Sequence, residues 1–220
     1  MAETRIKSRV LSHTRLSDTA YQLRIERKGL VFRAGELLSL YGEATLDSRD
    51  YTIASGEGDE ALDILYRLLP QGVLTPQLAR LQPGDALSFS GPCGSFQLRD
   101  ASVPLVFVAT GTGIAPCRSF LRTYPELDLT LLHGARETVD LFYRDEWAAK
   151  AYYPCVSRVP VEGFQGRVSD RIKLLSLPPD AHFYLCGANE MIYEVSEWLL
   201  KAGFASEQIF KEPYYYRADD

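Results

Sequence analysis

The sequence lacks the features that mark several large classes of protein. No uncharged apolar run approaches the roughly 18 to 20 residues that a membrane-spanning helix needs. The first residues contain no apolar core like that of a signal peptide, and the 16 glycines and 12 prolines follow no collagen-like period. Because 46% of the residues are hydrophobic, the chain has enough apolar surface to fold. We therefore expect a folded, soluble and cytoplasmic protein.

Metal-binding patterns and an excess of basic charge are also absent. The spacings of Cys93, Cys117, Cys155 and Cys186 match no zinc or iron–sulfur pattern, and the three histidines are widely separated. We expect no metal site, and free thiols that are mostly buried. The net charge of −5 argues against a nucleic-acid-binding protein. Residues 1–33 nevertheless hold eight Lys or Arg against three acids, either as a solvated strand face or as a docking surface for an acidic partner.

The two halves of the chain differ in pattern. From about residue 5 to 99, short β-rich runs alternate with turn signals, which is typical of an antiparallel barrel or sandwich. From about residue 103, apolar strands alternate with glycine loops and helical stretches, as in a doubly wound parallel α/β domain. We expect the boundary near 99–102. The sequence therefore predicts an antiparallel β-barrel domain over 1–100 and an α/β domain over 101–220.

A glycine loop follows the first apolar strand of the second half and leads into a helix expected near 116–123. Backbone N–H groups and the helix dipole at such a turn can bind a phosphate. Glycine lets the backbone approach closely, and Pro116 suits the first helical turn. A purely structural turn is the alternative, because Ala115 and Pro116 stand where a third glycine would complete the longer pattern. The loop residues are Thr110, Gly111, Thr112 and Gly113.

A second candidate lies on an expected strand of the first half. Arg49 and Tyr51 share one face of that strand, whereas Asp50 and Thr52 point to the other. A guanidinium beside a phenol could hold a phosphate while the aromatic ring covers a flat heterocycle. An exposed arginine beside a core tyrosine is the alternative.

Together these motifs resemble the ferredoxin–NADP reductase family of flavoprotein oxidoreductases. The segment Arg49-Asp-Tyr-Thr resembles the flavin motif Arg-x-Tyr-Ser/Thr, and Gly111-Thr-Gly-Ile-Ala-Pro resembles the loop that binds the nicotinamide pyrophosphate. The resemblance covers about residues 5 to 214. The remaining matching motifs, in chain order, are Gly72-Val-Leu-Thr-Pro-Gln-Leu, Pro83-Gly-Asp, Gly91-Pro-Cys-Gly-Ser-Phe, His133-Gly-Ala-Arg, Gly166-Arg-Val-Ser-Asp and Tyr184-Leu-Cys-Gly-Ala-Asn-Glu-Met.

The resemblance implies an FAD-binding antiparallel barrel followed by an NADP(H)-binding α/β domain, with the active site in the cleft between them. It implies that Arg49 binds the flavin phosphates, that Tyr51 packs on the isoalloxazine ring and that Thr52 lies near its N5 atom. Serine is more frequent in the family at the last position, so Thr52 keeps the hydroxyl and adds a methyl group. The remaining implied flavin-binding residues are Asp50, Thr75, Gly91, Cys93, Gly94 and Ser95.

The resemblance also assigns residues of the second half. Cys186, beside Gly187, would lie near the nicotinamide. Glu212 and Tyr214 resemble the Glu-x-Tyr ending of plant-type members, in which a terminal tyrosine stacks on the flavin. This chain continues for six residues beyond Tyr214, which leaves the register of the stacking tyrosine open. The implied catalytic residues are Thr52, Cys186 and Glu212.

The choice between NADPH and NADH depends on positive charge near the adenosine ribose. Ser157 and Arg158 end an expected strand, Arg167 follows Gly166, and NADPH-using members carry similar residues at similar places. Arg136, in the motif that begins at His133, is a further expected cofactor contact. Solvated surface charge is the alternative for Arg158 and Arg167. We therefore expect NADPH as the electron donor.

The expected activity is hydride transfer between NADPH and FAD, with single electrons passing between FAD and a ferredoxin or flavodoxin. The electron carrier must be a separate protein, because the chain has no iron–sulfur cysteines of its own. A competing hypothesis is an NADH-dependent reductase component of an oxygenase or of another electron-transfer chain. A non-catalytic binding module without flavin and an enzyme that uses free flavin as its substrate are two more hypotheses. FAD rather than FMN is what the resemblance implies.

Overall fold

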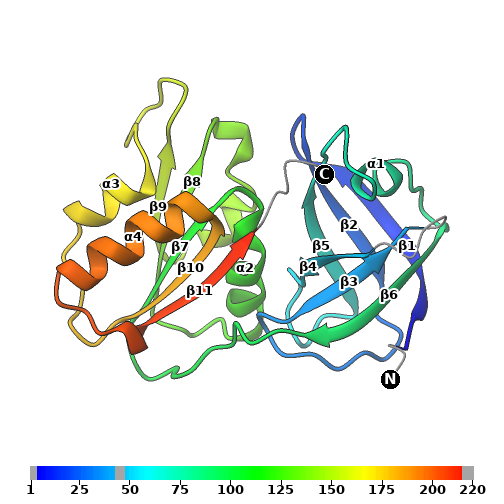
Figure 1. Cartoon of the computed structure of the whole chain (residues 1–220), viewed down its shortest axis with the longest axis horizontal. Coiled ribbons are helices and arrows are strands. Elements are labelled where there is room, and N and C mark those ends of the chain that lie inside the picture. Colours follow the sequence, from blue (N-terminus) through cyan, green and yellow to red (C-terminus); the bar gives the residue numbers. More distant parts are fainter. Residues whose placement is uncertain (1–3, 43–47, 215–220) are drawn as a thin grey trace. The chain divides into compact units, whose positions relative to one another are not determined.

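The computed structural model describes residues 4–42 and 48–214. Two compact units make up the chain (Figure 1). Most of helix α2 (Ile114–Thr123) belongs with the first unit, although it follows the glycine loop of the second unit in sequence. The expected domain boundary between residues 100 and 101 stays a prediction. Of the described residues, the first unit contains those up to Gln97 and Ala115–Pro125; the second contains Leu98–Ile114 and those from Glu126 to Tyr214.

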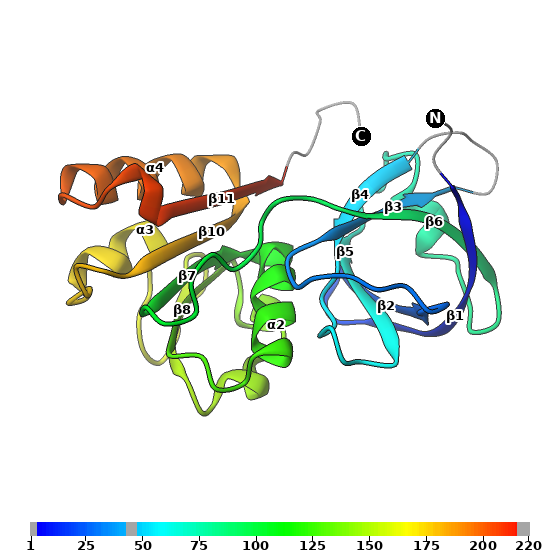
Figure 2. The same cartoon turned by 90° about the horizontal axis from the view of Figure 1, so that it is seen from below.

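The first unit is built on an antiparallel sheet of six strands in the order β4-β3-β6-β1-β2-β5. Its two outer strands meet where Ile53 forms an antiparallel bridge with Ile64 and the N–H of Ala54 donates to the carbonyl of Asp63 at 2.8 Å. These contacts close the sheet into a barrel (Figure 2). The elements are β1 (Ile6–Arg15), β2 (Ala20–Glu26), β3 (Leu37–Tyr41), β4 (Ser48–Thr52), β5 (Ala61–Arg67), the short helix α1 (Thr75–Leu78) and β6 (Ala86–Cys93).

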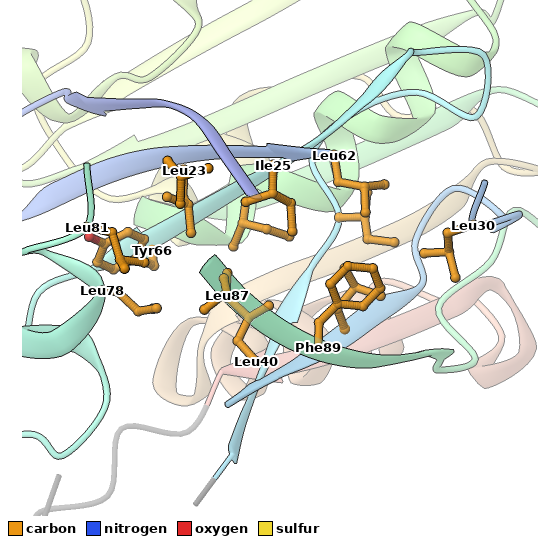
Figure 3. Packing of buried hydrophobic residues seen from close by; sticks show 14 of the residues in the cluster. Leu23, Ile25, Leu30, Leu40, Leu62, Tyr66, Leu78, Leu81, Leu87 and Phe89 are labelled. Carbon is orange, nitrogen blue, oxygen red and sulfur yellow. The ribbon is translucent and has the colours of Figure 1, made fainter. Parts of the chain in front are cut away.

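The barrel interior is filled by alternate apolar side chains of these strands. Figure 3 shows side chains from β2 and β5 facing those from β3 and β6. Apolar residues alternate along these strands in the sequence because every second side chain of a strand points to the same face, here the barrel interior. Burying each large aliphatic side chain stabilises the barrel by roughly 1.5–3 kcal/mol. Fully buried members are Leu23, Ile25, Leu38, Leu40, Ile53, Leu62, Ile64 and Phe89.

Helix α2 is joined to the barrel by polar contacts. The Arg118 guanidinium donates from Nη1 to Oδ2 of Asp63 at 3.0 Å and to the carbonyl of Ala54 at 3.2 Å. The hydroxyl of Ser119 donates to the carbonyl of Ser55 at 2.7 Å. Because the side chains of Arg118 and Asp63 are 7% and 4% exposed, water contributes little to their solvation. The helix is therefore held by a buried ion pair as well as by packing.

The second unit is a parallel sheet of five strands in the order β11-β10-β7-β8-β9. Helices α3 and α4 contribute to the apolar core against one face of this sheet, where Val195 and Leu199 are fully buried. This antiparallel sheet followed by a parallel sheet with helices confirms the expected fold class. The elements are β7 (Leu105–Thr110), β8 (Leu129–Ala135), β9 (Ala151–Val156), α3 (Val168–Arg171), β10 (His182–Ala188), α4 (Asn189–Lys201) and β11 (Ile209–Tyr214). Among the described residues, no helix is long and apolar enough to cross a membrane.

Strand β9 departs from the sequence expectation of a strand over 155–159. It begins at Ala151 and ends at Val156, with Pro154 inside it. Proline cannot donate to a sheet ladder, so it normally argues against a strand interior. Here β9 is the last strand of the sheet, so one side of it needs no partner. The expected helical stretch near 143–151 is correspondingly short, a single 3₁₀ turn over Arg144–Trp147.

Candidate functional site

The Arg-x-Tyr-Thr segment forms β4, the strand at one end of the barrel sheet. In its pairing with β3, Arg49 lies opposite Leu40 and Tyr51 lies opposite Leu38. Directly paired residues share a face, so both side chains lie on the face of these core leucines, and the ring of Tyr51 packs against the core. Asp50 lies on the opposite face, where it accepts a hydrogen bond from the hydroxyl of Ser39.

The Gly91–Ser95 turn lies at the same end of the sheet as Thr52. Leu37 of β3 pairs with Thr52 on one side and with Cys93 on the other. Two strand spacings, about 10 Å, therefore separate the backbones of Thr52 and Cys93. Thr52 is buried, whereas Cys93 is exposed. The sequence-predicted flavin residues of β4 and of this turn thus converge on one sheet end.

Glycine is required within this turn for conformational reasons. Gly91 and Gly94 have φ angles of +113° and +111°, in a region that other residues rarely adopt. A Cβ atom at Gly91 would lie 3.1 Å from the carbonyl oxygen of Leu37. Such a backbone can bring successive N–H groups to a phosphate. The donor chemistry of the turn, together with the Arg49 guanidinium and the Tyr51 ring, fits a flavin nucleotide. The individual roles stay predictions.

A hydrogen-bonded pair that the sequence analysis missed supports Tyr51. The ring of Tyr66 meets the ring of Tyr51 at 78° with centroids 6.3 Å apart. The Tyr66 hydroxyl lies 2.8 Å from Nε2 of His13, and Nδ1 of His13 lies 3.0 Å from the carbonyl oxygen of Leu81. A carbonyl can only accept, so Nδ1 carries the proton and Nε2 accepts from the Tyr66 hydroxyl. No local motif could reveal a pair of residues 53 positions apart.

The sequence Thr75-Pro76 predicts Thr75 as the N-cap and Pro76 as the first helical residue, but Thr75 does not cap helix α1. The helix begins at Thr75 itself, and Leu74 occupies the N-cap position. The Thr75 hydroxyl instead donates to the carbonyl of Leu69 at 3.1 Å and accepts from its N–H at 2.9 Å. This exchange closes the 69–75 turn, because it satisfies both backbone groups of Leu69. A flavin contact by Thr75 stays a prediction.

The glycine loop of the second unit lies at the carboxyl end of the parallel sheet. Thr110 ends β7, and the loop forms one 3₁₀ turn before α2 begins at Ile114. Gly111 has a φ of +55°, and the N–H of Ala188 donates to the Thr110 hydroxyl oxygen at 3.0 Å. Pro116 falls in the first turn of α2, where its missing N–H leaves no bond unmade. Thr112 is buried.

The loops after β7 and β10 touch each other so closely that side chains are excluded. A Cβ atom at Gly113 would lie 2.5 Å from the carbonyl oxygen of Cys186. A Cβ atom at Gly187 would lie 2.7 Å from the backbone carbonyl oxygen of Thr110. Neither distance is possible without displacement of backbone. The two loops therefore form one surface at this sheet edge, the edge at which open α/β sheets bind ligands.

Strand β11 brings the C-terminal candidates to the same edge. Cys186 pairs with Ala109 of β7 on one side and with Glu212 of β11 on the other. Cys186 is fully buried, and Tyr214 lies beside Ala188. The sequence-predicted Cys186, Glu212 and Tyr214 thus lie beside the glycine loop. The tyrosines at 215 and 216, which could also supply the stacking ring, lie outside the described residues.

Three parallel backbone segments bring the predicted cationic residues together. The N–H of Ser157 donates to the carbonyl of Ala135 at 3.1 Å, and the N–H of Arg158 donates to that of Arg136 at 3.0 Å. On the other side, Val156 forms a parallel bridge with Gln165. Arg167 follows Gln165 by two residues and directly precedes α3. The backbone segments that carry Arg136, Arg158 and Arg167 therefore lie next to one another on either side of Ser157.

The histidine of the His-Gly-Ala-Arg motif has no acid–base role in this arrangement. His133 is fully buried on β8, and its Nδ1 lies 3.2 Å from the hydroxyl of Tyr152. Burial lowers the pKa of His133 to about 3, so the ring is neutral. Within residues 4–42 and 48–214, no cluster of three or more His, Cys, Asp or Glu could hold a metal ion.

Two known protein families match successive parts of the chain. Residues 6–98 match the oxidoreductase FAD-binding domain, and residues 107–197 match the oxidoreductase NAD-binding domain. Among curated relatives, ferredoxin–NADP reductase B of Sorangium cellulosum is 33% identical over 221 residues, which cover 87% of this chain and 89% of the relative.

A longer relative and a solved structure extend this comparison. The toluate 1,2-dioxygenase electron transfer component of Pseudomonas putida is 29% identical over 218 residues and 90% of this chain, which spans only 64% of that relative. The crystal structure of a ferredoxin NADP+ reductase from Neisseria gonorrhoeae with bound FAD and NADP has a TM-score of 0.87. At 23% identity over 96% of this chain and 99% of the other, this likeness shows the fold.

Proposed function

Because this chain belongs to the ferredoxin–NADP reductase family of flavoprotein oxidoreductases, we propose that it transfers a hydride between NADPH and FAD and single electrons between FAD and a ferredoxin or flavodoxin. The observation that carries this proposal is the joint surface of the glycine loop and the Cys186–Gly187 turn beside Glu212. FAD, when bound, accepts a hydride and releases electrons one at a time. The protein supplies binding, orientation and exclusion of water.

The residues of the first unit hold the flavin in this proposal. Arg49 and the N–H groups of the Gly91–Ser95 turn bind its phosphates, and the ring of Tyr51 covers its ring system. Tyr66, held by His13, limits the rotation of Tyr51. Thr52 is buried and presents a hydroxyl at the same sheet end.

The residues of the second unit hold the nicotinamide nucleotide. The loop at Gly111 and Gly113 binds the pyrophosphate at the start of α2. Cys186 is a small buried side chain at the loop surface, so a planar ring can approach it without displacing a bulky group. The cluster of Arg136, Arg158 and Arg167 supports NADPH as donor, because a 2′-phosphate needs cationic partners.

The acidic carrier docks, in this proposal, on the outward face of β1. Some basic residues of the N-terminal stretch already form ion pairs within the chain. Arg15 pairs with Asp18 at 2.7 Å, and Lys28 pairs with Glu26. Lys7 and Arg9 are exposed at alternate positions of β1. Their charge complements an acidic ferredoxin or flavodoxin. The cytoplasmic location expected from the sequence stays a prediction.

Anaerobic stopped-flow reduction of the purified protein, with NADPH and NADH in parallel, tests the donor. We expect NADPH to bleach the visible flavin band faster than NADH. Faster bleaching by NADH would still support a reductase but would contradict the role of Arg136, Arg158 and Arg167 in binding NADPH. Absence of flavin absorption after reconstitution with FAD would contradict the proposal that the protein is a flavin-dependent enzyme.

Steady-state turnover with a ferredoxin, a flavodoxin or free flavin tests the acceptor. We expect Lys7→Glu to raise the KM for the acidic carrier at low salt, and high salt to reduce that effect. Arg15→Glu is the matched control, because it lies on the same strand but is paired with Asp18. Equal effects of both changes would argue against docking on this face.

The similarity to an oxygenase electron transfer component favours a second candidate. In that case NADH is the donor, and a separate iron–sulfur protein of an oxygenase accepts the electrons. The stopped-flow comparison separates the two candidates by the preferred nucleotide.

A further inference from the structure

An acidic side chain of α4 pairs with Arg167, one of the three predicted cationic residues. Oε1 of Glu194 lies 3.6 Å from Nη1 of Arg167. Glu194 is in the first half of α4, whereas Arg167 immediately precedes α3, so the contact joins two elements that are distant in sequence. The side chains of Arg167 and Glu194 are 69% and 44% exposed, which leaves the pair accessible to a bound anion.

We propose that Glu194 is a specificity-determining residue that weakens the preference for a 2′-phosphorylated nucleotide. The proposal rests on the proposed function, in which Arg158 and Arg167 face the 2′-phosphate. It goes beyond that function because it assigns to an acidic residue the task of limiting the discrimination between NADPH and NADH.

Two electrostatic effects carry this inference. First, the Glu194 carboxylate competes with a phosphate for the Arg167 guanidinium, so binding of the phosphate must break an existing ion pair. Second, a carboxylate within one side-chain length of a phosphate repels it. NADH carries no 2′-phosphate and experiences neither effect. Because both side chains are largely solvated, water screens these effects to the order of a threefold to tenfold change in affinity.

The same helix provides a matched control. Glu197 lies one turn beyond Glu194 and pairs with Lys201 at 3.0 Å, with side chains that are 51% and 71% exposed. Glu194→Gln and Glu197→Gln therefore remove the same charge from exposed positions of the same helix and break ion pairs of the same kind. They differ in whether the partner belongs to the proposed phosphate site.

The direct test is a binding titration of each holoenzyme variant with 2′-phospho-AMP and with 5′-AMP. We expect Glu194→Gln to tighten 2′-phospho-AMP binding about threefold to tenfold and to change 5′-AMP binding less than twofold. We expect Glu197→Gln to change both by less than twofold. The gain should shrink at high ionic strength, because exposed charges are screened. Steady-state kinetics should show a matching rise in the ratio of kcat/KM for NADPH to that for NADH.

A double-mutant cycle shows whether Glu194 acts through Arg167. In a protein that already carries Arg167→Gln, we expect Glu194→Gln to lose most of its effect. Equal effects of Glu194→Gln and Glu197→Gln would overturn the proposal, as would unchanged affinity for 2′-phospho-AMP. Failure of the proposed function would appear differently, as a flavin that neither NADPH nor NADH reduces in the unmutated protein.

Discussion

Arg118 of α2 and Asp63 of β5 form a buried ion pair in which Nη1 lies 3.0 Å from Oδ2. The second carboxylate oxygen of Asp63 faces Arg24, whose Nε lies 3.8 Å away. Taking such charges out of water is costly, and their mutual attraction and hydrogen bonds offset that cost. The intact pair therefore adds little to the free energy of unfolding, but removal of one partner lowers that free energy strongly.

We expect Arg118→Met to reduce the free energy of unfolding by about 3–5 kcal/mol, because it leaves the Asp63 carboxylate buried without its main partner. Arg122→Met is the control on the same helix. Arg122 binds Asp59 at 2.7 and 2.9 Å, but the two side chains are 37% and 22% exposed. We expect that change to cost about 1 kcal/mol. Urea unfolding measures both, and equal losses would contradict the distinction.

The burial of His133 should make the folded protein less stable in acid. Burial lowers its pKa to about 3 in the folded protein, whereas an unfolded chain binds the proton below about pH 6.5. Above pH 7 the imidazole is neutral in both states, so it adds no pH dependence. As the pH falls from about 6.5 toward 3, the unfolded state gains protons first and stability is lost.

We expect His133→Leu to remove about 2 kcal/mol of the stability difference between pH 7.5 and pH 5. The loss of the hydrogen bond to Tyr152 lowers stability at both pH values and does not alter this difference. Urea unfolding at the two pH values gives the result. An unchanged difference would show that His133 is not the group responsible.

We expect Gly113→Ala to weaken binding of NADP+ at least tenfold while FAD remains bound. The added methyl group would come within 2.5 Å of the carbonyl oxygen of Cys186, so the loop must move. Gly58→Ala is the control, because a Cβ atom there meets nothing within 4 Å. Difference spectroscopy with NADP+ measures binding, and the visible absorption measures FAD content. Normal NADP+ binding by the Gly113 variant would contradict the proposed pyrophosphate site.

Tyr66 offers a graded test of its support for Tyr51. We expect Tyr66→Phe to cost about 1 kcal/mol of stability, since it removes the hydrogen bond to His13 but keeps the ring contact with Tyr51. We expect Tyr66→Leu to weaken FAD binding as well, because it also removes that ring. Flavin content and visible circular dichroism of the two variants distinguish these effects. Equal FAD affinity in both would show that the ring contact has no role in flavin binding.

The parts of the fold that sequence predicted depend on local pattern. Alternating apolar residues predicted the barrel strands, and the continuous apolar run before Thr110 predicted β7, because the burial of a strand determines which of its positions are apolar. The two glycine-rich turns were visible because positive φ angles and close backbone approach require glycine. The prediction of a strand over 155–159 was wrong about where β9 begins and ends, since the sequence does not reveal that the strand lies at a sheet edge, where Pro154 is tolerated.

The contacts that sequence could not predict join distant positions. Arg118 and Asp63 are 55 residues apart, and no motif near either one indicates the other. The pairing of Glu194 with Arg167 depends on how α4 and α3 lie in the folded unit. A charged residue in isolation reads as solvated surface, so only the structure distinguishes a paired arginine from one poised for an anion.

The grouping of α2 with the barrel has a consequence for synthesis on the ribosome. The chain leaves the first unit after Gln97, contributes a strand and loop to the second, and returns for Ala115–Pro125. Until that return segment has emerged, Asp63 lacks its closest cationic partner, and the part of the barrel that α2 contacts stays exposed to water. The N-terminal unit can therefore finish folding only after α2 has been synthesised. A segment of the second unit is thus translated before the first unit is complete.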